Sequence, residues 1–168
     1  KTNGFKMDKT LVVLGIIGFC SMAVEGAMFD WSGVYFQDVV KVAKENIVLG
    51  YTSFMIMMAT GRFVGDKLIQ KIGKKTTLQI SGILMFLGMG LSVIFPEVTT
   101  CVFAFMLVGI GVACNVPVVY SIAGRHKTIA SGIAITMVSS ISFLGFLMGP
   151  PLIGYIAELW DLRYSFGI

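Results

Sequence analysis

Five long runs of apolar residues restrict what this chain can fold into. They cover about residues 10–40, 47–65, 76–95, 98–124 and 128–157, and short polar segments separate them. A helix needs about 20 apolar residues to cross roughly 30 Å of hydrocarbon. Because lipid offers the backbone no hydrogen-bond partners, each run is expected to be helical. We therefore predict an all-α, polytopic membrane helix bundle with about five transmembrane helices and the start of a sixth.

The composition agrees with a lipid environment. The chain is 56% hydrophobic and 13% charged, whereas charged residues make up about 25% of a soluble domain. Its cysteines, Cys20, Cys101 and Cys114, lie inside apolar runs, so we interpret them as small core residues. The sequence shows no metal-ligand cluster, Walker-type loop or nucleophile triad, and no basic run typical of nucleic-acid binding. We expect no enzyme, no cofactor, no metal site and no nucleic-acid partner.

The basic residues fall mainly into alternate turns between the runs. One side of the predicted bundle receives most of them: Lys1, Lys6, Lys9, Arg62, Lys67, Lys71, Lys74, Lys75, Arg125 and Lys127. The other side receives Lys41, Lys44 and Arg163. Because Lys and Arg collect in cytoplasmic loops, we predict a cytoplasmic N-terminus. The chain ends at Ile168 as a further apolar stretch begins at Tyr164, so we expect it to be cut from a longer protein.

An acidic residue, Glu25, lies near the middle of the first run, where a carboxylate costs at least about 2.5 kcal/mol. It is either held by a neighbouring helix for packing alone or forms a substrate or proton site in a water-filled cavity. Burial penalises the charged form of a carboxyl group, which suits proton coupling. Asp30 lies roughly 140° further around the helix, so the two share a face only if the helix breaks at Gly26. Asp30 and Trp31 are either site residues or interfacial residues.

Polar side chains also occur in the fourth and fifth runs. Asn115 lies a few residues past the middle of the fourth run, where an amide suits either a ligand site or plain interhelical hydrogen bonding. Ser139 and Ser142 lie near the middle of the fifth run. Serines there favour close helix packing, and both residues stay candidates for the substrate site.

Proline and glycine are expected to shape these same two runs. Pro117 removes a backbone hydrogen bond two residues after Asn115. The fifth run contains the segment Gly145-Phe-Leu-Met-Gly149-Pro150-Pro151. Its Gly-x-x-x-Gly spacing predicts a face of close helix contact, and its two prolines predict a kink.

The stretch from Gly61 to Lys75 is interpreted as a short basic hairpin between the second and third runs. It contains a Gly, then an Asp followed by a basic residue, then a Gly followed by two basic residues. This order resembles the loop signature of the major facilitator superfamily, in the looser form found between helices eight and nine. Five residues separate Lys67 from Gly73, where the strict motif has one. The residues assigned to this gating-loop motif are Gly61, Arg62, Gly65, Asp66, Lys67, Gly73, Lys74 and Lys75.

The other runs are similar to the same family in their order. The first resembles helix seven of permeases in the fucose-permease-like branch, the fourth resembles helix ten, and the fifth resembles helix eleven. The resemblance implies the C-terminal half of a twelve-helix transporter whose halves rock about a central site. It implies that Glu25 and Asn115 face the cavity. It also implies that Asp66 lies near residues 128–130, where a helix N-terminus favours a carboxylate, and holds the cytoplasmic gate shut.

These observations predict secondary active transport of a small polar solute, such as a sugar, with proton coupling through Glu25. Transport is expected to proceed by alternating access in the bacterial inner membrane. The expected partners are the solute, protons, the lipid bilayer and the N-terminal half of the same transporter. Two alternatives stay open: a drug or metabolite efflux permease, and a truncated membrane protein that transports nothing.

Overall fold

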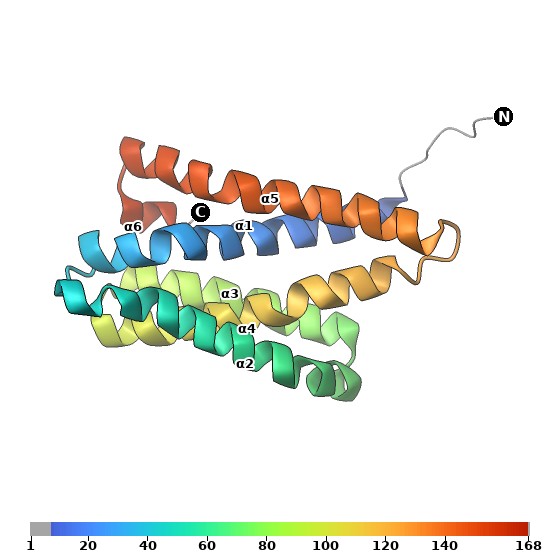
Figure 1. Ribbon diagram of the computed structural model, residues 1–168, viewed down its shortest axis with the longest axis horizontal. Helices are drawn as coiled ribbons and strands as arrows, with labels where there is room; N and C mark the ends of the chain where they lie inside the picture. The colour runs from blue at the N-terminus through green and yellow to red at the C-terminus, as the bar shows by residue number, and fades with distance from the viewer. Residues whose placement is uncertain (1–7, 168) are drawn as a thin grey trace.

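The computed structural model describes residues 8–167, which form an all-helical bundle (Figure 1). No strand occurs in this part of the chain. Five helices are long and apolar enough to cross a membrane, which confirms the predicted fold class. The elements are α1 (Lys9–Asp38), η1 (Lys44–Asn46), α2 (Val48–Ile72), α3 (Lys74–Ile94), α4 (Val98–Ala123), α5 (Ser131–Leu159) and the short α6 (Leu162–Ser165).

The second helix is longer than the sequence pattern predicts. The interpretation of Gly61 to Lys75 as a hairpin is wrong for most of its length, because α2 continues to Ile72 and α3 begins at Lys74. Residues 66–72 are mostly good helix formers, so the helix continues past its apolar part. The turn is Gly73 alone, with φ of 83°, a left-handed conformation that glycine adopts at no steric cost.

The long helices alternate in direction, so that the predicted basic turns meet at one end of the bundle. The start of α1, the junction of α2 with α3, and the turn between α4 and α5 all lie at the right-hand end in Figure 1. Lys9, Lys74 and Arg125 therefore share this end, and Lys44 lies at the other. Lys1, Lys6 and Ile168, on which the orientation and truncation predictions also drew, lie outside the described residues.

The most extensive contact in the bundle joins α1 to α5. Glycines of α5 lie directly against the backbone of α1: Gly145 against the carbonyl of Phe19 and Gly149 against that of Ala23. This is the close-contact face that the Gly-x-x-x-Gly spacing predicts. Pro150 and Pro151 lie within the continuous helix, as Pro117 does in α4. The kinks expected at these prolines stay a prediction.

The other long helices form a second group, in which α4 packs against both α2 and α3. Here too glycines permit the approach. Gly109 of α4 lies against the backbone of α2 at Phe54, and Gly111 lies against the carbonyl of Ser81 in α3. The bundle thus consists of an α1–α5 pair beside an α2–α3–α4 group, with less contact between the two.

Hydrogen bonds at the two ends of the bundle join helices that are distant in sequence. Arg163 donates to the carbonyls of Val93 and Ile94 at the end of α3, over 2.6 Å and 3.1 Å. At the opposite end, His126 Nε2 lies 3.2 Å from Asp8 Oδ2. The backbone N–H of Thr10 donates to Asp8 Oδ1, and this bond, with a smaller contribution from His126, lowers the pKa of Asp8.

The glycine contact between α1 and α5 predicts a sensitive site at Gly149. A Cβ atom at this position would lie 2.5 Å from the carbonyl oxygen of Ala23, and a backbone atom cannot move aside as a flexible side chain can. Gly149→Ala is therefore expected to destabilise the full-length protein by roughly 1–3 kcal/mol, as overpacking does. Thermal unfolding of the purified protein in detergent measures the change.

The matched control is Gly90→Ala in α3, because nothing lies within 4 Å of the added Cβ there. This variant should unfold at the wild-type temperature or slightly above it. Equal melting temperatures for the two variants would show that α1 and α5 are not in close backbone contact.

Candidate functional site

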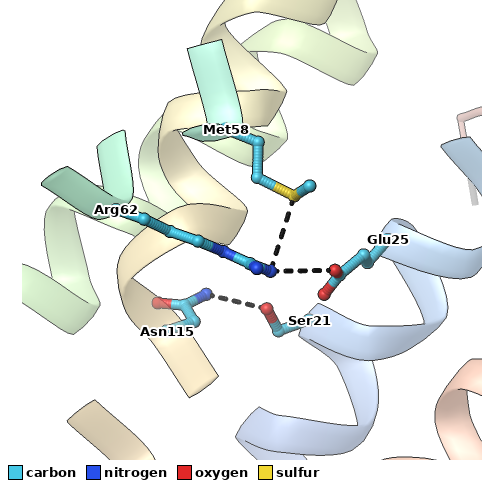
Figure 2. A network of polar contacts seen from close by, with 5 residues as sticks. All are labelled: Ser21, Glu25, Met58, Arg62 and Asn115. Atoms are coloured by element: carbon cyan, nitrogen blue, oxygen red, sulfur yellow. Dashed lines mark hydrogen bonds and ion pairs between the residues drawn. The ribbon is translucent and has the colours of Figure 1, made fainter. Parts of the chain in front are cut away.

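The candidate site is built around Glu25 in the middle of α1. Its Oε1 atom lies 3.2 Å from Nη2 of Arg62 on α2 (Figure 2). The side chain of Glu25 is 9% exposed, whereas that of Arg62 is 54% exposed. The pair therefore links the two helix groups, with the acid buried and the base at the surface of the described chain.

The backbone on the other side of α1 explains why Glu25 can face α2. Gly26, the next residue, faces α5, where the carbonyl of Phe146 would meet a Cβ atom at 2.7 Å. That carbonyl has no helical donor, since Pro150 four residues later lacks an N–H. Gly26 does not break α1, which is continuous from Lys9 to Asp38. The close contact with α5 thus holds one face of α1, and the adjacent face presents Glu25.

The pairing of Arg62 with Glu25 was not predicted from the sequence, which placed Arg62 in a gating loop. Arg62 lies ten residues before the end of α2, about 15 Å along the helix axis. Nη2 also contacts Sδ of Met58, one helical turn earlier, at 3.8 Å. A basic residue that directly follows an apolar run could have been matched to the nearest intramembrane acid, because such charges pair with one another.

A second polar contact lies next to the ion pair (Figure 2). Nδ2 of Asn115 on α4 donates to Oγ of Ser21 over 3.3 Å, and Ser21 lies one helical turn before Glu25. Asn115 is 2% exposed. Its Oδ1 atom is buried and has no hydrogen-bond partner among the described residues, which is uncommon for a buried polar atom. The structure thus brings Glu25 and Asn115, both selected from the sequence, into one cluster.

Asp30 and Trp31 lie apart from this cluster. Trp31 Nε1 donates to the carbonyl oxygen of Pro150 over 3.0 Å, so its indole ties α1 to α5. Asp30 is exposed and forms no hydrogen bond or ion pair within residues 8–167. Both line a shallow groove between α1 and α5. Because α1 is unbroken, the condition under which Asp30 would share a face with Glu25 is not met.

The two candidate serines of α5 have their hydroxyl groups bonded within their own helix. Ser142 Oγ donates to the carbonyl of Val138 over 2.8 Å, and Ser139 Oγ donates to that of Thr136 over 3.0 Å. Ser142 is buried against Gly18 of α1. These contacts favour the packing interpretation for Ser142.

The residues assigned to the gating-loop motif divide into two kinds. Gly61 and Gly65 pack against Ala113 and Cys114 of α4. Asp66, Lys67 and Lys75 are exposed, and Lys74 donates to Oγ of Ser121 on α4 over 2.7 Å. These contacts join α2 and α3 to α4.

Asp66 does not lie near residues 128–130, as the resemblance implied. Figure 1 shows α2 and α5 on opposite sides of the bundle, and no hydrogen bond between Asp66 and the start of α5 occurs in the described residues. The physical reason is that α5 pairs with α1 through glycine contacts, which leaves α2 against α4.

The ion pair predicts a coupled effect on stability. At alkaline pH, Arg62→Gln leaves the Glu25 carboxylate buried without a cation. We expect it to lower the free energy of unfolding by roughly 1–3 kcal/mol, towards the lower value because Arg62 is half exposed. Glu25→Gln added to Arg62→Gln should restore part of this loss. A double-mutant cycle on melting temperatures measures the coupling, and strictly additive effects would contradict the contact.

Comparisons with known proteins give a consistent result. The sequence matches the Major Facilitator Superfamily over residues 13–168. It is 36% identical over 148 residues to Membrane protein MosC of Rhizobium meliloti, covering 88% of this chain and 36% of that protein. It is 33% identical to an uncharacterized transporter of Sinorhizobium fredii, over 94% of this chain and 42% of that protein.

A further relative is an uncharacterized MFS-type transporter of Yersinia pestis, 29% identical over 94% of this chain and 41% of that protein. The chain therefore spans about two fifths of the length of the curated relatives it matches. A crystal structure of the peptide transporter POT superimposes with a TM-score of 0.85, over 98% of this chain and 35% of that one. With 17% sequence identity, this match shows a shared fold.

Proposed function

Since the chain belongs to the major facilitator superfamily, we propose that it is part of a secondary active transporter. The transported solute is small and polar, such as a sugar, and moves with protons by alternating access. One observation carries this proposal: a buried carboxyl group, Glu25, is paired with a half-exposed guanidinium of Arg62 in the middle of the helix bundle. An intramembrane acid with a breakable ion pair suits a proton relay.

Asn115 supports a polar solute. Its buried Oδ1 atom has no donor in residues 8–167, and leaving such an acceptor unpaired costs roughly 1–3 kcal/mol. A hydroxyl or amine group of a bound solute would satisfy this oxygen. Because the amide lies beside the ion pair (Figure 2), solute and proton would bind within the same cluster.

Residues 9–165 are proposed to correspond to helices seven to eleven and the start of helix twelve, with the fucose-permease-like branch as the subfamily. The share of the relatives' length that the chain covers supports a half transporter. The end that carries Lys74 and Arg125 is proposed to face the cytoplasm, because basic residues gather there. A bacterial inner membrane is proposed as the location, which the bacterial source of the relatives supports.

The proton role of Glu25 gives a direct test on the full-length protein in proteoliposomes. Glu25→Gln keeps the shape of the side chain but cannot take up a proton. We expect it to abolish accumulation of solute driven by a pH gradient, while exchange of solute across the membrane continues. Radiolabelled uptake and a pH-sensitive dye inside the vesicles measure the two activities.

The matched control is Asp38→Asn, which removes a carboxylate at the C-terminal end of the same helix. It should leave proton-driven accumulation unchanged. Normal accumulation by the Glu25→Gln variant at every pH would remove Glu25 from the mechanism. Absence of any solute movement by the wild-type protein would favour the non-transporting alternative.

Asn115 provides a second test, which separates solute binding from packing. Asn115→Leu fills a similar volume and removes a buried acceptor that has no partner, but it also removes the hydrogen bond from Nδ2 to Ser21. Because these two effects oppose one another, the melting temperature should stay close to that of the wild type. Affinity for the solute should fall by roughly tenfold or more, because its hydrogen bond to Oδ1 is lost. A lower melting temperature with unchanged affinity would show that the amide serves helix packing.

A further inference from the structure

A contact between Asp8 and His126 joins the two helix groups at the basic end of the bundle. Asp8 directly precedes α1, and His126 lies in the turn that connects α4 to α5 (Figure 1). His126 Nε2 lies 3.2 Å from Asp8 Oδ2. Because the turn continues α4 of one group and leads into α5 of the other, this contact acts on the ends of three helices.

Both ring nitrogens of His126 have a partner, and these partners assign the hydrogen of the neutral ring. Nδ1 lies 3.4 Å from the backbone nitrogen of Thr128, whose N–H can only donate. Nδ1 is therefore the acceptor, and Nε2 carries the hydrogen that points to Asp8. A second proton goes to Nδ1, which can then donate to Oγ1 of Thr128 at 3.2 Å. Protonation thus leaves each nitrogen with a partner and turns the contact with Asp8 into an ion pair.

The charges around the turn favour a dependence on pH. The hydrogen bond from Thr10 and, to a smaller degree, His126 hold the pKa of Asp8 below its ordinary value of 3.8. An imidazole changes its charge between about pH 5 and 8, where the carboxylate of Asp8 stays ionised. Helix α4 and the first half of α5 contain no charged side chain. The other charged residues at this end of the surrounding elements are cations: Lys9, Arg125, Lys127, Lys74 and Lys75.

The same three helices share an apolar cluster next to this contact. Its buried members come from the first turns of α1, the end of α4 and the start of α5: Leu11, Leu14, Val119, Ala123, Ala134 and Val138. Apolar packing does not depend on the charge of the imidazole, so the cluster holds the helices together at every pH. A change in the charge of His126 therefore acts on the helix ends alone.

We propose that Asp8 and His126 form a latch, closed by protons from the cytoplasm, that holds the start of α1 against the turn between α4 and α5. The protonated ring closes the latch as an ion pair. The neutral ring leaves a hydrogen bond that water can replace, so the helix ends loosen. The cytoplasmic position rests on the proposed orientation of the chain.

The latch has a consequence for regulation, which rests on the proposed transport function. Uptake of a solute with protons acidifies the cytoplasm. As protons accumulate there, His126 becomes charged and the inner ends of α1, α4 and α5 are held together. Movement of these ends then becomes less favourable, so the latch slows uptake when the cytoplasm is already acidic.

Distances between spin labels test the latch in the full-length protein in lipid nanodiscs, with its native cysteines replaced by serine. Lys9→Cys and Gly132→Cys each carry one label. Lys9 is exposed, and nothing lies within 4 Å of a Cβ atom added at Gly132. We expect a narrow distance distribution near the lower end of the range from about pH 5 to 8 and a broader, longer one near its upper end. The ratio of open to closed forms should change by up to about fivefold, the worth of an exposed ion pair.

Variants of the two residues separate charge from packing. His126→Gln has no charge and should give the broad distribution at both pH values. His126→Lys stays charged and should give the narrow one at both. Asp8→Asn keeps a good N-cap residue for α1 but removes the anion, and it should abolish the response to pH. Lys127→Gln, which removes an exposed cation from the same turn, is the matched control and should respond as the wild type does.

The outcomes separate the latch from the transport function. If the wild-type distances do not change with pH, or if they lengthen at acidic pH, the latch is overturned and the transport function is unaffected. A wild-type response in His126→Gln or His126→Lys overturns it as well. If the wild-type protein moves no solute while the distances follow the charge of the ring, the latch stands and the transport function fails. Should one variant not fold, the other two and the wild type give the answer.

Discussion

The backbone contact between α1 and α5 is the interaction on which the site depends. In lipid, apolar side chains gain little by leaving their surroundings, so helices associate through close packing and hydrogen bonds. Gly145 and Gly149 bring α5 against the carbonyl groups of α1, and Gly26 does the same from the other side. With α1 held on that face, its adjacent face is fixed toward α2 and α4. Glu25 and Ser21 lie on this face, which is why a carboxyl group in the middle of a membrane helix meets Arg62 and Asn115.

The contacts between the two helix groups combine apolar packing with polar contacts. Phe36 of α1 packs against Phe105 of α4 and against Gly50 of α2. Across the boundary, several contacts are polar: Glu25 to Arg62, Ser21 to Asn115, and the hydroxyl group of Tyr35 to the carbonyl of Ser92 over 2.7 Å. Polar contacts of this sort can exchange partners with water, protons or a solute, whereas interlocked glycine surfaces cannot. The polar residues of the site thus lie at the boundary between the two helix groups.

Much of the fold could be predicted from the sequence, because lipid imposes one structure on each long apolar run. The number of long helices, their alternating direction and the glycine face of α5 all follow from hydropathy, charge and spacing. The end of α2 could not be placed, since residues 62–72 mix basic and polar side chains with apolar ones, and the helix continues through them. Glu25 and Asn115 could be selected because polar and ionisable residues are rare in transmembrane helices unless they take part in function or pair with another helix. Their partner Arg62 could not be assigned, because pairing depends on which helices are neighbours, and the same gap led to the wrong position for Asp66.

The single-residue connection at Gly73 has a mechanical consequence for the helices that it joins. Two links between Cα atoms, from Ile72 to Lys74, reach at most roughly 7 Å, so the end of α2 cannot separate from the start of α3. Lys74 is in turn bonded to Ser121 at the end of α4. The three helices are therefore tied together at one end by the chain and by these hydrogen bonds. Arg62 lies about 15 Å along α2 from this tether, so a tilt of α2 about the tethered end displaces Arg62 less than it displaces the far end of the helix.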